Sequence, residues 1–118
     1  MLLEINPSSP KPLFEQIAAA VRDQVATGTL RAGTRLPSAR DLAEQLGVNL
    51  HTVLKAYQGL REEGLVEMRP GRGSVISKQA RALPALTPHV DDLLERATAA
   101  GIELEALISL LRARSSPS

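Results

Sequence analysis

A helix stop and a helix start lie two residues apart near the middle of this chain. Gly47 follows a short amphipathic segment, and glycine is the residue that most often ends a helix in the left-handed conformation. Asn49 is a favoured N-cap for the helix that follows. Because two helices joined by so short a connection must turn sharply, this pattern predicts a helix-turn-helix unit.

Caps and apolar spacing define both helices of this unit. Ser38 can cap the first helix, and Asp41 three residues later completes a pair that resembles a capping box. The apolar side chains of the first helix recur at i, i+3, i+4 and i+7: Ala39, Leu42, Ala43 and Leu46. The second helix ends at Gly64. Its expected inward residues are Val53, Tyr57 and Leu60.

The flanking segments complete a winged helix-turn-helix pattern over residues 11–78. A preceding helix is predicted by apolar residues at every fourth position, Leu13, Ile17, Val21 and Val25, and it should end at Gly28. After Gly64 the periodicity changes, and LVEMR, RPGRG and SVISK are typical of strand, turn and returning strand. The predicted fold class is therefore mainly α with a small β-hairpin.

The remaining residues predict a helical tail. ARALPALTP has the composition of a linker, after which Thr87 can cap a helix with Pro88 at its first position. Gly101 separates this helix from a last one, and both carry an apolar stripe that two short helices cannot bury alone. We expect residues 1–79 to form one domain and 80–118 a dimerisation tail. The expected dimer residues are Val90, Leu93, Leu94, Leu104, Leu107, Ile108 and Leu111.

Charge is distributed unevenly along the chain. The net charge of +1 divides into −1 for residues 1–30, +4 for residues 31–81 and −2 for residues 82–118. A basic middle segment is compatible with a polyanion partner such as nucleic acid. The chain has no cysteine, no basic region at its start and no apolar run long enough to span a membrane. These features predict a cytoplasmic protein without a membrane partner.

Five blocks in order resemble one family of proteins. PLFEQI, GTLRAGTRLPSARDLA, VNLHTVLKAY, LREEGLV and GRGSV are similar to the amino-terminal domain of GntR-type bacterial transcriptional regulators. Most members of that family continue into a large effector-binding or aminotransferase-like domain, whereas about forty residues remain here. The short tail resembles the YtrA-like subfamily. This resemblance implies a homodimer that binds an inverted repeat in double-stranded DNA, most often as a repressor.

The candidate DNA-binding residues come from three places. In the helix-turn-helix, Arg40 should point outward, where the resemblance implies a DNA contact, and Ser38 could add a phosphate contact to its capping role. The start of the reading helix presents Asn49, Leu50, His51, Thr52 and Lys55. The family usually has a basic or polar residue where this chain has Leu50, which could instead contact thymine methyl groups. The wing contributes Arg69, Arg72 and Gly73, and Arg72 could enter a narrow minor groove.

Other kinds of function fit the sequence less well. A winged-helix module that binds protein is the main alternative, but the basic middle segment argues against it. A small-molecule effector is compatible with the chain, although the linker and stripes offer few polar groups to specify one. His51 and His89 lack metal-ligand spacing, and no nucleotide-binding or catalytic motif is present, so we expect no metal, cofactor or enzymatic activity. Tyr57 is assigned to the core, with a hydroxyl that could reach a phosphate.

Overall fold

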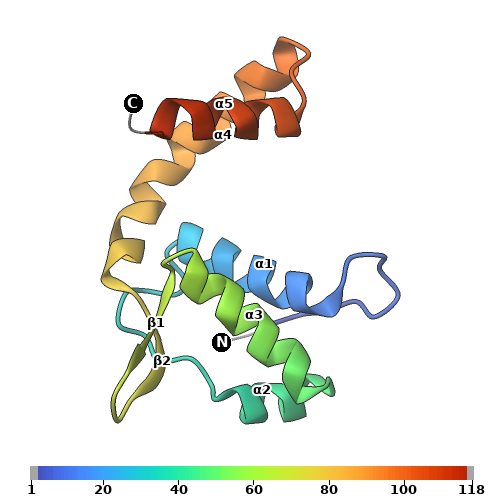
Figure 1. The fold of residues 1–118 in the computed structure, drawn as a ribbon, viewed down its shortest axis with the longest axis vertical. Helices are drawn as coiled ribbons and strands as arrows, with labels where there is room; N and C mark the ends of the chain where they lie inside the picture. The colour runs from blue at the N-terminus through green and yellow to red at the C-terminus, as the bar shows by residue number, and fades with distance from the viewer. Residues whose placement is uncertain (1–2, 117–118) are drawn as a thin grey trace. The chain divides into compact units, whose positions relative to one another are not determined.

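The structure, a computed structural model, describes residues 3–116 of the 118-residue chain. Two compact units divide the chain, Met1–Pro84 and Ala85–Ser118. The first unit contains three α-helices, a β-hairpin and a short 3₁₀ helix, and the second contains most of α4 (Leu83–Ala99) together with α5 (Leu104–Ser115) (Figure 1). The predicted fold class, mainly helical with one small hairpin, is confirmed.

The three helices of the first unit begin and end where the caps predict. They are α1 (Leu13–Ala26), α2 (Ala39–Leu46) and α3 (Leu50–Glu62). The Ser38 hydroxyl accepts a hydrogen bond from the Asp41 backbone N–H at 3.1 Å, and Asn49 Oδ1 accepts one from the His51 N–H at 2.8 Å. Gly47 has a φ of 67°, so the left-handed turn between α2 and α3 is one that glycine adopts without strain.

One apolar core holds this unit together. Ile17, Val21 and Val25 of α1 are fully buried and share the core with residues of α3 and the hairpin. The core residues from these later elements are Val53, Ala56, Tyr57, Leu60, Val66 and Ile76. An ion pair between Arg22 and Glu63, at 3.0 Å, joins α1 and α3 at the surface. α1 therefore packs against α3, the second helix of the helix-turn-helix.

The hairpin is a wing of two antiparallel strands, β1 (Val66–Arg69) and β2 (Gly73–Ile76). Val66 pairs with Ile76 and Arg69 pairs with Gly73, so the strand register places the tip at residues 70–72. The chain before α2 pairs with the other edge of β2, through a bridge between Arg35 and Val75. The wing is thus attached on both sides. Its tip, α2 and the first turn of α3 lie toward the same end of the unit (Figure 1, bottom).

The fourth helix begins earlier than the sequence predicts. ARALPALTP is not a linker: it contains the end of a 3₁₀ helix, η1 (Lys78–Ala82), and the start of α4 (Leu83–Ala99). Thr87 and Pro88 consequently lie inside α4 rather than at its start. Pro84 occupies the first turn, where a helix does not need the missing N–H. Burial of Ala80 in the core stabilises the turn that leads into α4.

The second unit is a helical hairpin of α4 and α5 (Leu104–Ser115). Gly101, with a φ of 75°, lies at the turn between them. Ala97 and Leu107 are buried, whereas the large apolar residues around them are exposed. In the described part of the chain, no helix has the length and apolar character needed to cross a membrane.

Candidate DNA interface

The first turn of α3 presents the expected reading residues to solvent. Asn49, Leu50 and His51 are exposed, and Thr52 is half-buried. The side-chain oxygen of Asn49 is occupied by its capping bond to His51, which leaves the Asn49 amide group available as a donor. This part of α3 can therefore offer hydrogen-bond donors, a hydroxyl and an apolar side chain to a surface that it approaches.

An apolar strip runs along the same helix. Leu50 and Leu54 are four residues apart, which places them on one face, and they are 36% and 43% exposed. Leu54 also lines a groove with Ser38 at the start of α2 and Met68 and Gly73 of the wing. The sequence interpretation missed Leu54 and Met68, although the i, i+4 spacing from Leu50 was a usable signal for Leu54. Methyl groups are the part of a base edge that such side chains can contact.

Arg40 is exposed in the first turn of α2. Within the described residues it forms no ion pair, and in particular none with Glu44, four residues later on the same helix. Its guanidinium group can therefore grip a guanine edge or a phosphate in bidentate fashion without first breaking a salt bridge. Ser38 at the end of the preceding loop has its hydroxyl oxygen committed to the cap of α2.

Tyr57 connects α3 to the loop that positions α2. Its side chain is 4% exposed, and its hydroxyl donates a hydrogen bond to the Pro37 carbonyl oxygen at 2.7 Å. The assignment of Tyr57 to the core is confirmed. The hydroxyl is directed to Pro37, which lies immediately before the Ser38 cap. Burial raises the pKa of the Tyr57 phenol far above its usual value, so the hydroxyl remains a donor at neutral pH.

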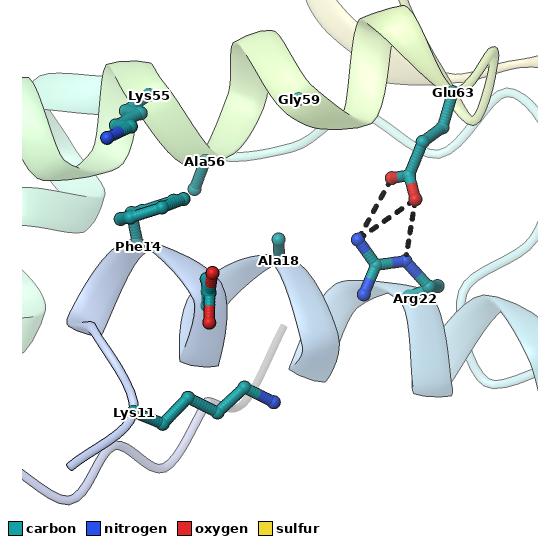
Figure 2. A pocket seen from close by; sticks show the side chains of 9 residues that line it. Lys11, Phe14, Ala18, Arg22, Lys55, Ala56, Gly59 and Glu63 are labelled. Atoms are coloured by element: carbon teal, nitrogen blue, oxygen red, sulfur yellow. Dashed lines mark hydrogen bonds and ion pairs between the residues drawn. The ribbon is translucent and has the colours of Figure 1, made fainter. Parts of the chain in front are cut away.

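Lys55 is held against the side chain of Phe14. The Lys55 Nζ lies 4.0 Å from the centre of the Phe14 ring, which is the geometry of a cation–π contact (Figure 2). Phe14 comes from the first turn of α1, and the same groove is bordered by His51 and Thr52. The sequence interpretation did not find this contact, because residues 14 and 55 come together only when α1 packs on α3.

The two wing arginines differ in how they are held. Arg69 is paired with Glu67, with 2.7 Å between an Arg69 terminal nitrogen and Glu67 Oε1. Arg72 carries no such acidic partner among the described residues, and its Nη2 donates a hydrogen bond to the Gly33 carbonyl at 3.3 Å. Gly73, with a φ of 78°, follows Arg72 and begins β2. Because Glu67 offsets the charge of Arg69, Arg72 is the wing arginine whose positive charge is more available to a phosphate.

The structure places five of the predicted residues in two grooves of the first unit. Ser38 and Gly73 line one groove, between α2, α3 and the wing. His51, Thr52 and Lys55 line another, between the starts of α1 and α3. Arg40 and Leu50 belong to neither lining but are exposed on the same helix-turn-helix.

Comparisons with known proteins identify the family of this chain. Residues 13–76 match the family described as "Bacterial regulatory proteins, gntR family". The chain is 35% identical over 112 residues to the HTH-type transcriptional repressor YtrA of Bacillus subtilis, an alignment that covers 90% of this chain and 86% of the relative. It is 46% identical over 76 residues to the HTH-type transcriptional regulator Rv1152 of Mycobacterium tuberculosis, which covers 64% of this chain and 63% of the relative.

A solved structure with the same fold comes from the same family. It is YtrA from Sulfolobus acidocaldarius, described as a GntR-family transcription factor, with a TM-score of 0.64 and 33% identity over 84% of this chain and 99% of that chain. The family is one of transcription regulators and not of enzymes. The protein is a YtrA-like member of the GntR family of DNA-binding transcriptional regulators.

Proposed function

We propose that this protein acts as a homodimer that binds an inverted-repeat operator and represses transcription by covering promoter DNA. Residues 1–79 would bind DNA and residues 80–118 would form the dimer. The observation that carries this proposal is the exposed guanidinium of Arg40, without an ion pair among the described residues, beside the exposed first turn of α3. The relative from Bacillus subtilis is named a repressor, which supports the direction of regulation.

In this proposal some residues hold the DNA through its charge and others recognise its bases. Arg40, Lys55 and Arg72 supply positive charge to phosphates or guanine edges. Asn49, His51 and Thr52 offer hydrogen bonds to base edges, and Leu50 contacts thymine methyl groups. Ser38 and Gly73 approach the backbone, and Arg69 adds charge only when its pair with Glu67 opens.

Dimerisation through the tail is supported by its exposed apolar residues. Val90, Leu104 and Leu111 are 51%, 56% and 50% exposed, and Leu93 and Leu94 are also exposed. Ile108 is half-buried and belongs to the same proposed surface. Leu107, at 5% exposed, packs inside the α4–α5 pair, so its effect on a dimer is indirect. A second copy would cover this surface and would double each DNA contact, as the symmetry of an inverted repeat requires.

The experiment that tests the proposal is selection of bound sequences from random DNA. The full chain should enrich an inverted repeat, and a chain shortened after Pro84 should enrich only a weakly bound half-site. Shortening at Pro84 keeps Ala80 and Leu83, both of which pack in the core of the first unit. Recovery of single, non-repeated sites by the full chain would reject the dimeric mechanism.

Salt dependence gives an independent measure of the phosphate contacts. If each subunit neutralises about three to five phosphates, the logarithm of affinity should fall against the logarithm of salt concentration with a slope of roughly −5 to −9. Each good base contact should favour the correct base by about 1 to 3 kcal/mol. Binding that does not change with salt concentration would exclude this interface.

A further inference from the structure

A cavity of about 510 Å³ in the first unit lies away from the residues assigned to DNA. It is bordered by the end of α1, the loop that follows α1 and the η1 turn. Two arginines, Arg31 and Arg81, line it together with apolar residues. The apolar lining consists of Leu30, Ala32, Ala80 and Pro84. Sites for small molecules commonly have this size and this mixture of apolar walls with a few polar groups.

The charge of this cavity is uncompensated. Among the described residues that line it, none is acidic, and neither Arg31 nor Arg81 has an ion-pair partner in the described part of the chain. Two arginines that border one cavity with no acidic neighbour create a local positive potential that favours an anion. The fold brings them together from segments fifty residues apart in sequence.

We propose that this cavity binds a small organic anion, a carboxylate or phosphate ester that carries an apolar group. Arg31 and Arg81 hold the anionic end by charge-assisted hydrogen bonds, and the apolar group contacts Leu30, Ala80 and Pro84. The segment between the wing and the tail offers few polar groups that could bind an effector, and Arg81 is one of them. The structure adds a second polar residue, Arg31, from the loop after α1.

The cavity is joined to the wing by a single turn. The Thr34 N–H donates to the Arg31 carbonyl at 3.0 Å, and Gly33, at a φ of 86°, forms the corner between them. The Gly33 N–H donates to the Ile76 carbonyl of β2 at 2.7 Å, and the Gly33 carbonyl accepts the hydrogen bond from Arg72. A ligand that pulls on Arg31 therefore acts on the turn that holds the wing. This coupling rests on the DNA contact proposed for Arg72, whereas anion binding does not.

Binding is tested on the full chain by amide NMR titration with benzoate and with phenyl phosphate, using benzyl alcohol as the uncharged control. We expect saturable shifts at the amides of Gly28, Leu30–Ala32 and Ala80–Arg81 with at least one anion and none with the alcohol. The anion with the lower dissociation constant identifies the preferred class. No saturable shift at these amides below about 10 mM, or equal shifts with the alcohol, would overturn the proposal.

Matched variants separate the site from general charge effects. Arg31→Gln and Arg81→Gln should each raise the dissociation constant by about ten- to a hundredfold, the size expected for a hydrogen bond to a charged group. Arg112→Gln removes the same charge from α5 and should leave the constant unchanged. The spectra themselves report whether each variant is folded. Equal weakening by all three variants would assign the shifts to non-specific charge and reject the site.

A second titration measures whether anion binding changes DNA binding. The protein is titrated with the operator recovered by selection, in the presence and in the absence of the more tightly bound anion. The anion should change operator affinity in the wild type and not in Arg31→Gln. If the anion does not change operator affinity in the wild type, the coupling between cavity and wing is rejected. Whether the cavity binds an anion is then decided by the NMR titration alone. If Arg31→Gln weakens operator binding as strongly as Arg40→Ala without any anion, Arg31 supports DNA binding without a ligand, and the proposed coupling through the anion is rejected. Failure to bind DNA would overturn the proposed function alone.

Discussion

The Tyr57 hydroxyl shows how one buried polar atom can organise a binding surface. Its hydrogen bond to the Pro37 carbonyl joins the middle of α3 to the residue before the α2 cap. The bond is half-enclosed, so a carbonyl left without its partner would carry a desolvation cost. The bond therefore ties α3 to the loop that leads into α2, the helix that carries Arg40.

Tyr57→Phe removes this hydrogen bond without removing the ring. We expect the free energy of unfolding to fall by about 1 kcal/mol, measured by urea titration. Because the folded-state pKa of the phenol is raised, the wild type should also lose stability as pH rises above about 10, where the unfolded phenol ionises. The variant should lack this loss of stability. An unchanged alkaline profile in the variant would show that another group causes it.

Arg40→Ala tests the exposed guanidinium of α2. Operator affinity should fall by about 1 to 3 kcal/mol, because the substitution removes both hydrogen bonds of a bidentate pair, while the dimer and the thermal transition stay unchanged. A gel-shift titration measures the first effect and sedimentation measures the second. Glu44→Ala on the same helix is the control, since it alters the neighbouring charge without removing a proposed DNA-binding group. Equal affinity for wild type and Arg40→Ala would remove Arg40 from the interface.

At the scale of elements, the wing depends on pairing at both edges of β2. β1 pairs with one edge, and the segment before α2 pairs with the other through Arg35 and the Leu36 N–H, which donates to the Ser74 carbonyl at 2.8 Å. A two-stranded hairpin alone is marginally stable in water. The extra pairing therefore fixes where the tip, and Arg72 with it, is held.

Arg72→Ala should reduce the binding of phosphate by the wing. We expect weaker operator binding and a salt slope that is shallower by about 1 for each subunit, because a phosphate that no arginine neutralises keeps its bound counterion. The slope is measured by fluorescence anisotropy over a series of salt concentrations. Arg112→Ala, in the tail, removes equal charge and should preserve the slope. A slope identical in wild type and Arg72→Ala would exclude a phosphate contact by this residue.

At the scale of the whole molecule, the tail has more apolar surface than its own two helices cover. Ala97 and Leu107 are the residues buried in the described part of the second unit, while Val90, Leu104 and Leu111 remain at least half exposed. Exposed apolar stripes on both helices indicate association rather than an independent domain. The proposed dimer accounts for this surface.

Leu111→Glu should dissociate the dimer, because a charge would be buried against an apolar partner. Sedimentation at micromolar concentration should then give the monomer mass, and operator affinity should fall because a monomer binds only one half-site at a time. Leu110→Glu is the matched control: Leu110 is 55% exposed and Leu111 is 50% exposed, but Leu110 lies about 100° around the same helix, outside the proposed stripe. A dimer that persists in Leu111→Glu would move the interface elsewhere.

The sequence by itself determined the three helices and the hairpin of the first unit and their order. Ser38, Gly47 and Asn49 act on neighbouring backbone atoms, so their effect can be predicted without knowledge of the rest of the fold. The change of hydrophobic periodicity after Gly64 likewise predicted the wing. The order of the five sequence blocks that resemble GntR-type regulators predicted the family. The same local reasoning misplaced the start of α4. Ala80, just before α4, is buried in a core formed by residues that are distant in sequence, and this burial stabilises the turn that precedes the helix.

Only the tertiary structure decided which side chains meet. Lys55 lies over Phe14, the Tyr57 hydroxyl reaches Pro37, and Arg31 lines one cavity with Arg81. Each pair is separated by at least twenty residues, and no periodicity or spacing in a single sequence encodes contacts at that distance. Caps and turns are fixed by hydrogen bonds within a few residues, whereas grooves, paired charges and the engagement of each arginine depend on how the helices pack.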